Sequence, residues 1–333
     1  MRVARLAALA CGALVSACAL AQSWPTKPIH LMLGYTTGGA ADAMARPLIA
    51  KMEPALGQPL IIDYRPGAGA TVAAQATAAA APDGYTLHLI DAGPMTIVPH
   101  VTRVSYDPLS SFTPIGFVCS GGTAIVVHPS LPVNSLDDLI RLARAQPDKL
   151  SYGTSGVAGA GHMAAELLQI AAGIKMVHVA YKGGAPAMTD LLGGHIPLLF
   201  ASMGTAVPYI KSGKIKALAV TSSRRVPAIA DVHTVAELGF AGFEALIWFA
   251  LVGPAKLPTD VVAKLSRALT NALEDRSRRN DPRGPREVAQ GGARGEHPVR
   301  MRQNPSEKGA CGIDCRATWL QPRRAEPRFG RRF

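Results

Sequence analysis

The regular alternation of two kinds of segment between residues 29 and 273 restricts this chain to a small set of folds. Short runs rich in Val, Ile and Leu have the length of buried strands, and the Ala- and Leu-rich segments between them have helical spacing. Strands that alternate with helices predict an α/β architecture with mainly parallel sheets. The predicted strands are residues 29–33, 60–64, 85–90, 124–128, 176–181, 196–200 and 215–220, and the predicted helices are residues 42–56, 70–80, 136–145, 162–171, 185–192 and 259–273.

The first 21 residues have the features of a secretory signal peptide. Arg2 and Arg5 form a short basic start, residues 6–20 are small and apolar, and Ala21 ends an A-x-A cleavage site. A lipoprotein cleavage box ending at Cys18 also fits, but we expect simple cleavage after Ala21 without a lipid anchor. The mature chain is therefore predicted to be a soluble periplasmic protein.

Disulfides are not expected to hold this fold together. The compartment is oxidising, yet Cys119 is the one cysteine in the body of the mature chain. About 250 residues of ordinary apolar content are enough for two domains, each with its own hydrophobic core.

Residues 276–333 differ sharply in composition from the rest of the chain. Here 15 Lys and Arg stand against 6 Asp and Glu, so most of the net charge of +12 lies in this Arg-rich tail. Its few large apolar residues follow neither a helical nor a strand period, so we expect disorder. An out-of-frame reading of G/C-rich DNA and a natural basic arm are the two explanations. A nucleic-acid partner would depend on this tail alone, and none is expected.

A glycine-rich turn, LGYTTGGAADAM at residues 33–44, connects an apolar run to a helical segment. Turns of this kind commonly bind anions, because the first amides of the helix are free. No Lys follows Gly39, as a P-loop would require. The spacing of Gly34, Gly38 and Gly39 also fails the dinucleotide-binding pattern. A nucleotide is therefore not the expected anion.

The same turn suits a carboxylate. Free amides at a helix N-terminus stand beside the hydroxyls of Thr36 and Thr37, and the flanking residues are small. The alternative is a tight strand–helix turn in which Asp42 only complements the helix dipole.

A second stretch, SYGTSGVAGAGHMAAELL at residues 151–168, repeats this arrangement of short strand, glycine-rich loop and helix. Packing alone rarely requires four glycines in nine residues, as residues 153–161 have. Two such turns that face each other across a cleft would each offer amides to one end of a diacid.

Enzymatic interpretations have less support. Gly153 to Val157 resembles a nucleophile elbow, but Val157 stands where the motif needs glycine. His162 and Glu166 lie one helical turn apart and could bind a metal, but the sequence suggests no third ligand, and we expect His162 to contact the loop instead. The pair Cys311 and Cys315 likewise lacks further zinc ligands. We therefore predict no catalytic residue, no metal and no cofactor.

The order of motifs along the chain resembles the Bug family, the TctC-like periplasmic solute receptors of tripartite tricarboxylate transporters. The resemblance covers roughly residues 24–275 and stops where the composition changes. The motifs that carry it are WPTKPIHLMLGYTTGGAADAMARPL, LIIDYRPGAGATVAA, AAPDGYTL, YDPLSSFTPIGFV, VVHPSLPVNSLDDLI, LSYGTSGVAGAGHMAAELL, MVHVAYKGGAPAMTDLLGGHIPLLF, GKIKALAVTSSRRVPAIADVHTVAELGF and WFALVGPAKLPTDVVAKL.

The resemblance implies a type II periplasmic-binding-protein fold with two Rossmann-like lobes and a hinge. Lobe one would comprise residues 22–98 plus 222–275, and lobe two residues 99–221. The ligand would be a small organic acid, held between the lobes by backbone amides and water and delivered by a monomeric receptor to membrane subunits of the transporter. The implied binding residues are Tyr35, Thr36, Thr37, Gly38, Gly39, Asp42, Thr96, Thr154, Ser155, Gly156, Gly159, His162 and Ala201.

The chain also departs from the family pattern. The family commonly has prolines at the positions of Thr36 and Thr37, hydroxyl residues within 158–160, and an Asp at the position of Ala201. The last helices of lobe one are absent, which predicts exposed apolar surface and poor folding. A secreted hydrolase, a basic interaction protein and a non-functional decayed copy of a receptor remain as alternatives to a working receptor.

Overall fold

The computed structural model describes residues 24–279. The predicted signal peptide with Cys18, and the tail from residue 280 onward with Cys311 and Cys315, lie outside the described residues. The predictions made for these two segments therefore stay predictions.

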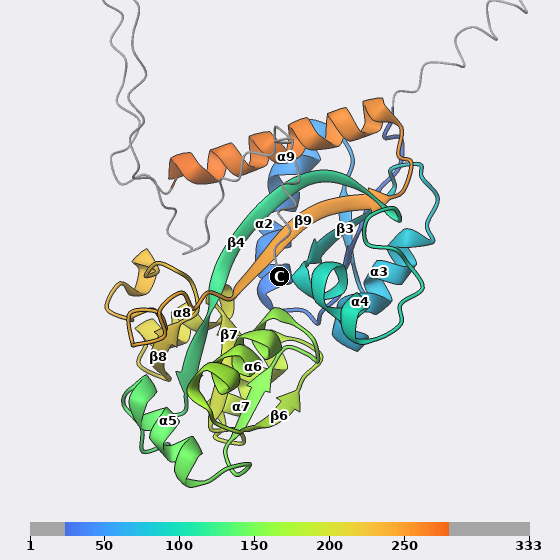
Figure 1. The fold of residues 1–333 in the computed structure, drawn as a ribbon. Coiled ribbons are helices and arrows are strands. Elements are labelled where there is room, and N and C mark those ends of the chain that lie inside the picture. The colour runs from blue at the N-terminus through green and yellow to red at the C-terminus, as the bar shows by residue number, and fades with distance from the viewer. Residues whose placement is uncertain (1–23, 280–333) are drawn as a thin grey trace, which may run out of the picture.

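A single sheet runs through both halves of the molecule (Figure 1), in the strand order β2-β1-β3-β9-β4-β7-β5-β6, with β8 also paired to β4. The strands are β1 (Ile29–Leu33), β2 (Leu60–Tyr64), β3 (Thr86–Asp91), β4 (Phe112–Val127), β5 (Ser151–Thr154), β6 (Val177–Ala180), β7 (Leu198–Ser202), β8 (Lys216–Val220) and β9 (Leu246–Pro254). The helices are α2 (Ala40–Leu56), α3 (Thr71–Ala78), α4 (Val98–Val101), α5 (Leu136–Ala145), α6 (Ala160–Ala172), α7 (Gly184–Leu192), α8 (Met203–Lys211) and α9 (Thr259–Arg279), with short turns η1 (Ala68–Ala70), η2 (Gly93–Ile97) and η3 (Pro227–Ile229).

The sheet is mixed, so the prediction of mainly parallel sheets is wrong. β1 pairs in parallel with β2 and β3, and β5 with β6 and β7, whereas every pairing of β4 and β9 is antiparallel. The reason lies in the paths of β4 and β9, which pass from one half of the molecule to the other. β9 enters the first half of the sheet beside the carboxyl end of β3, and β4 enters the other half beside the carboxyl end of β7. Each therefore runs antiparallel to the strand it meets.

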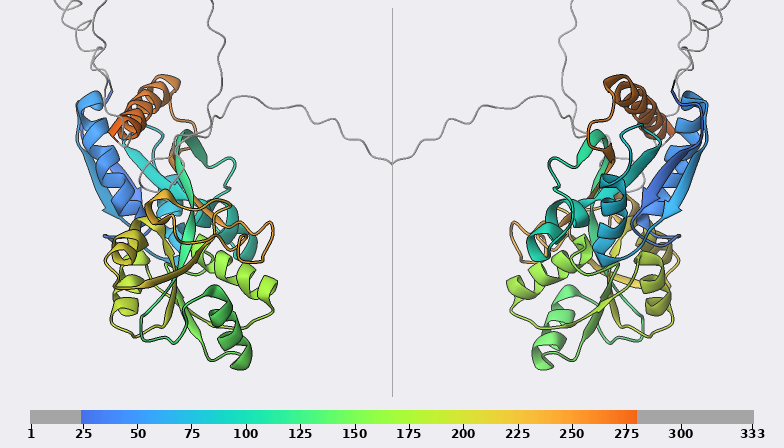
Figure 2. Two further views of the ribbon diagram at one scale, coloured as in Figure 1. Left: turned by 90° about the vertical axis from the view of Figure 1, so that its left-hand side faces the viewer. Right: turned by 90° about the vertical axis from the view of Figure 1, so that its right-hand side faces the viewer.

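Two lobes follow from this topology, and their cores are separate. We define lobe one as β1, β2, β3 and the adjoining parts of β4 and β9, and lobe two as β5 to β8 with the end of β4. In lobe one, α2 and α9 bury an apolar cluster that includes Leu31, Leu48 and Leu265. Residues 112–119 also pack in lobe one, which places the start of β4 on the lobe-one side of the crossing, beyond the predicted division at residue 98. Figure 2 shows the two lobes stacked one above the other.

Helix α9 covers lobe one and extends further than expected. Its buried side chains are Val261, Leu265, Ala268, Leu269 and Ala272. The helix continues through residues 276–279, the first residues of the segment for which disorder is predicted. Arginine is a good helix former, and a helix already fixed by packing extends at little cost. No helix among the described residues, α9 included, combines the length and apolar character needed to cross a membrane.

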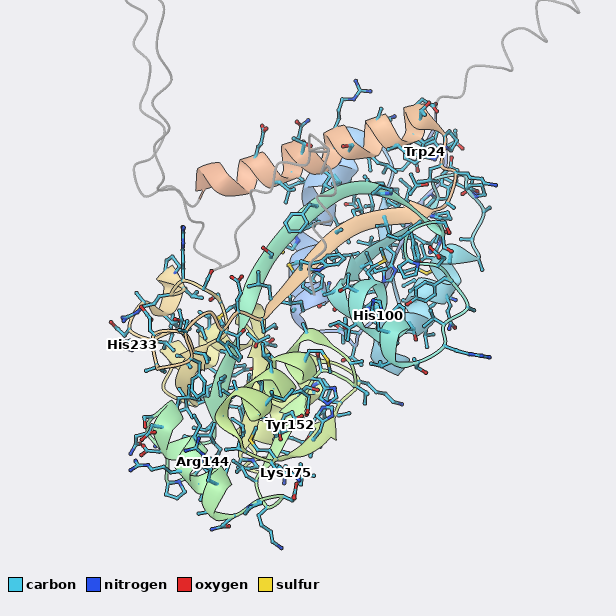
Figure 3. All side chains as sticks on the ribbon, viewed as in Figure 1. Trp24, His100, Arg144, Tyr152, Lys175 and His233 are labelled. Atoms are coloured by element: carbon cyan, nitrogen blue, oxygen red, sulfur yellow. The ribbon has the colours of Figure 1, made fainter. Side chains whose placement is uncertain are left out.

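Helix α9 also fixes the start of the described chain. The Lys264 ammonium donates a hydrogen bond to the carbonyl oxygen of Trp24, 3.0 Å away. The Trp24 ring packs against Tyr85, with 6.0 Å between the ring centroids. Figure 3 shows Trp24 at the margin of lobe one, beside one end of α9.

The expected exposure of apolar surface on lobe one is limited in the described structure. The large apolar side chains that are exposed there belong to separate elements: Ile61 on β2, Val72 on α3, Val101 on α4, and Leu109 in a loop. Poor folding of the chain stays a prediction.

The two lobes are joined where β4 changes partners. Residues 112–122 of β4 pair with β9, and residues 123–127 pair with β7 and β8. At the change, the buried hydroxyl of Thr221 accepts a hydrogen bond from the Thr123 amide and donates one to the Ala245 carbonyl, both at 2.7 Å. One side chain therefore ties together β4, the end of β8 and the approach to β9.

Replacing Thr221→Val should lower the free energy of unfolding by about 2 to 5 kcal/mol, because it removes the partner of a buried amide and of a half-buried carbonyl. Thr221→Ser keeps the hydroxyl and should cost about 1 kcal/mol for the lost methyl group. Urea denaturation of the full chain measures both. Equal losses in the two variants would show that the hydroxyl contributes nothing.

Candidate ligand-binding site

The parallel strands of both lobes end at the boundary between the lobes. Glycine-rich loops follow β1 (residues 34–39), β5 (155–159) and β6 (181–183), and a further loop (65–70) follows β2. In α/β proteins, ligands bind outside the carboxyl ends of such strands. The topology therefore brings all four loops to one region.

Two pairs of loops touch across this boundary. The Thr36 amide of lobe one donates a hydrogen bond to the Lys182 carbonyl of lobe two, at 3.3 Å. A β-carbon added to Gly183 would collide with the Thr36 hydroxyl oxygen. At the second contact, a β-carbon on Gly69 would lie 2.7 Å from the carbonyl oxygen of Val157. The first loop thus faces residues 182–185, and the 155–159 loop faces residues 67–70.

The helices that begin at this boundary have no capping side chain. Gly39, Gly159 and Gly183 precede α2, α6 and α7, and none of these helices has a side-chain hydrogen bond at its N-cap. By contrast, Ser135 caps α5, away from the boundary, by accepting from the Asp138 amide at 3.1 Å. Uncapped N-terminal amides together with the helix dipole are suited to an anion.

Asp42 is occupied within lobe one. One carboxylate oxygen accepts hydrogen bonds from the Gly38 amide (3.0 Å) and Arg46 (3.1 Å), and the other accepts from the Tyr64 hydroxyl. Burial alone would raise the pKa of Asp42, but these hydrogen bonds outweigh it and hold the pKa below its usual value. Asp42 therefore fixes the first loop in place, and its charge is already compensated.

His162 holds the second loop. Its Nδ1 accepts a hydrogen bond from the Ala158 amide at 3.1 Å, which confirms the prediction that His162 contacts the loop. Ala158 has a φ of 55°, a left-handed conformation that is unfavourable for a residue with a β-carbon. The hydrogen bond helps to retain that conformation, and the Ala158 amide is consequently not free for a ligand.

A stack of rings lies behind this loop. His162 and His178 stack at 3.9 Å between centroids, and Tyr152 stacks on His178 at 5.1 Å. His178 Nε2 lies 2.7 Å from the buried Thr154 hydroxyl, which in turn accepts from the Gly156 amide. Burial, followed by the neighbouring His162, lowers the pKa of His178 to about 4. Figure 3 shows Tyr152 within lobe two, near α6. The stacked rings of His162, His178 and Tyr152 therefore support the second loop from within lobe two.

A buried carboxyl group stands at the end of β3. Asp91 is 1% exposed, and its Oδ2 accepts a hydrogen bond of 2.6 Å from the Tyr35 hydroxyl. Its Oδ1 makes no hydrogen bond of good geometry. Burial raises the pKa of Asp91 to about 7, against smaller opposing effects of Tyr35 and nearby amides. Asp91 raises the pKa of Tyr35 further, beyond what burial of the phenol alone does.

Comparison with known proteins identifies the family. The family model described as tripartite tricarboxylate transporter family receptor matches residues 44–280. The chain belongs to this receptor family. The receptor is 33% identical to BugT of Bordetella pertussis over 259 residues, which cover 77% of this chain and 79% of BugT. The resemblance seen in the sequence is confirmed.

Solved structures confirm the fold. The periplasmic binding protein BugD superimposes with a TM-score of 0.71 at 34% identity, over 78% of the receptor and 85% of BugD. Rpa4515 of R. palustris with adipate gives a TM-score of 0.71 at 34% identity, over 74% and 83% of the two chains. MatC of Rhodopseudomonas palustris with bound malate gives 0.71 at 29% identity, over 75% and 86%. The predicted periplasmic-binding-protein fold is therefore correct.

The remaining predicted binding residues differ in position. Thr37 and Thr96 are exposed, and the Thr96 hydroxyl donates to the Ala92 carbonyl at 2.8 Å. Ser155 is half-buried in the second loop. Ala201 is 5% exposed in a core cluster of lobe two, paired with Ala124 of β4. Ala201 therefore packs in the core.

Sequence reasoning missed two parts of the receptor's interlobe region. The Lys182–Gly183 contact lies in AYKGGAP, a third strand–glycine–helix segment whose pattern was visible in the sequence. Asp91 ends the apolar run LHLID, and a carboxylate at the carboxyl end of a buried strand is also a readable signal. The Tyr35–Asp91 contact itself joins β1 to β3 and could not be read from local sequence.

Two further features bear on the choice of site. The described residues contain no cluster of three or more His, Cys, Asp or Glu side chains that could hold a metal ion. An open hollow of about 860 Å³ is lined by residues 99–111 alone, all from one segment of lobe one. Since no glycine-rich loop contributes to this hollow, the interlobe boundary is the better candidate site.

Asp91→Asn should stabilise the ligand-free receptor by an amount that grows with pH. The folded pKa of about 7 lies above the usual value, so folding favours the protonated acid. Stability is therefore lost as pH rises from about 4 to about 7, by up to about 4 kcal/mol. Tyr35 and Tyr106, which face Asp91, stay neutral throughout because their pKa values are raised.

Thermal unfolding of the wild-type and Asp91→Asn chains between pH 4 and pH 8 measures this difference. Asp83→Asn removes the same charge in the exposed turn that precedes β3 and is the matched control. A difference that stays constant with pH would contradict the raised pKa of Asp91.

Proposed function

We propose that the receptor binds a small carboxylate between its lobes in the periplasm and delivers it to the membrane subunits of a transporter. The observation that carries this proposal is the set of uncapped helix N-termini, α2 in lobe one and α6 and α7 in lobe two, that meet at the boundary. Rpa4515 with adipate and MatC with malate support it, because both of these similar proteins are described with organic acids.

Backbone amides supply most of the binding in this proposal. The amides of Gly39 and of the first turns of α2 and α6 would hold carboxylate oxygens, since N-terminal amides and the helix dipole favour a negative charge. The Gly38, Gly156 and Gly159 amides are already bonded within their loops and give those loops their shape. The hydroxyls of Thr36, Thr37 and Ser155 add donors. Asp42, Thr154 and His162 act by holding the loops. Thr96, in the turn η2 after β3, would line the end of the site away from the helix N-termini.

Closure of the lobes completes the site. The contacts of Thr36 with Lys182 and Gly183, and of Gly69 with Val157, are contacts between lobes, so they form only when the lobes approach each other. The crossing strands β4 and β9 are the connection about which the lobes would move. The closed, monomeric receptor would then be the form that membrane subunits recognise.

The alternative of a secreted hydrolase gains no support from the site. Thr154 lies beside His178, as a nucleophile lies beside its base, but Thr154 is fully buried and also bonds to the Gly156 carbonyl. The Thr154 hydroxyl donates its one proton to the Gly156 carbonyl, so His178 does not hold that proton as a catalytic base would. We therefore propose a binding function without catalysis.

Thermal-shift and calorimetric titration of the full chain against mono-, di- and tricarboxylates tests the proposed function. A ligand present at 100 times its dissociation constant should add about 2.7 kcal/mol to the stability. At least one acid should raise the unfolding temperature and bind with one-to-one stoichiometry. A cooperative melt that no acid shifts would refute the proposal, and absence of a melt would favour a decayed copy.

Gly183→Ala should weaken carboxylate binding about tenfold or more, because its methyl group would meet Thr36 and hold the lobes apart. Gly204→Ala is the matched control, since a β-carbon there meets nothing within 4 Å. Calorimetry measures affinity, and small-angle scattering with and without ligand measures closure. Unchanged affinity in the Gly183→Ala receptor would show that this contact is not part of the bound state.

A further inference from the structure

Asp91 is a buried acid, and only one of its two carboxyl oxygens is hydrogen-bonded. Tyr35 satisfies Oδ2, whereas Oδ1 is buried and makes no hydrogen bond of good geometry. None of the ion pairs within residues 24–274 involves Asp91. A buried carboxyl oxygen that no donor pairs, in a group without a counter-charge, is unfavourable, so a donor from outside the chain would relieve it.

The position of Asp91 connects it to the interlobe boundary. A β-carbon built on Gly93 would lie 3.3 Å from the Gly69 carbonyl oxygen, 3.5 Å from Asp91 Oδ1 and 3.6 Å from the Tyr35 hydroxyl. Three oxygens therefore surround the position that a side chain at residue 93 would occupy. Gly69 itself contacts the Val157 carbonyl of lobe two. Gly93 and Gly69, with the Val98 side chain beside Gly69, therefore link the surroundings of the Asp91 carboxyl group to the second loop.

The helix that follows does not use Asp91 as a cap. The turn η2 and helix α4, which begin after Ala92 and Ile97, have no side-chain cap hydrogen bond. Tyr106, the other phenol near this group, donates instead to the Pro94 carbonyl at 2.6 Å. The Gly93 amide at the start of η2 acts on the Asp91 carboxyl group, but its effect on the pKa is smaller than that of burial.

We propose that Asp91 accepts a hydrogen bond from a hydroxyl or ammonium group on the ligand, so that the receptor prefers carboxylates that carry such a donor. This inference rests on the proposed function. The helix N-termini bind the carboxylate ends of the ligand, and Asp91, held by Tyr35, is the acceptor for its substituent. An acid without a donor leaves Oδ1 unpaired and places an uncompensated negative charge near the buried acid, so it binds more weakly.

Two matched ligand series test the inference on the full chain by calorimetry. Succinate, malate and aspartate differ only in a hydrogen, a hydroxyl or an ammonium group at one carbon, and adipate and 2-aminoadipate form the longer pair. Within at least one series, the donor-bearing acid should bind about tenfold or more tightly than its plain counterpart. This comparison needs no variant, so it does not depend on how any substitution folds.

Asp91→Asn then assigns the preference to this residue. If Tyr35 donates to the amide oxygen, the amide nitrogen is presented to the ligand donor, so the tenfold preference should disappear while binding of the plain acid remains. Asp83→Asn changes the same charge in the exposed turn before β3 and should keep the preference.

Equal affinity of plain and donor-bearing acids for the wild-type receptor would overturn the inference while leaving the proposed function intact. A preference that survives Asp91→Asn would overturn it as well. Binding of none of these acids would count against the proposed function itself, and the inference would fail with it.

Discussion

The structure depends on the antiparallel crossing of β4 and β9 between the lobes. β4 enters lobe two beside the carboxyl end of β7, and β9 enters lobe one beside the carboxyl end of β3. The crossing therefore turns the carboxyl ends of the parallel strands of both lobes toward one boundary. The hydroxyl of Thr221 secures the point where β4 changes partners. Glycine-rich loops then meet because of topology, without attraction between their side chains, which is why so few charged residues are needed there.

The boundary separates two kinds of polar group. Asp42 and His162 are satisfied within their own lobes and give the two loops a fixed shape. The N-terminal amides of α2 and α6, and Oδ1 of Asp91, have no such partners. Free amide donors suit an anion, and the free oxygen of Asp91 suits a hydrogen-bond donor. Together these groups fit a ligand that carries both a carboxylate and a donor group.

Local sequence was sufficient for elements that carry their own pattern. The run IHLML predicted β1 to the residue, and Ser135 with the two acidic residues after it marked the start of α5. It was not sufficient for β4, which was expected at residues 124–128 only, because Pro114, Gly116 and Gly121 disfavour a strand until β9 pairs with them. In the site, the glycine-rich loops were predicted, whereas the partners of Asp42 and Asp91 come from other strands and required the fold.

The hydrogen bond between Lys264 and Trp24 joins residues 240 positions apart. A ribosome makes the chain from its N-terminus, so β1, β2 and β3 emerge long before β9 and α9, which close their sheet and cover their core. Lobe two has β5 to β8 in one continuous stretch and can assemble early. Lobe one is thus the last of the two lobes to become protease-resistant, and its leading strands stay uncovered until β9 and α9 have been made.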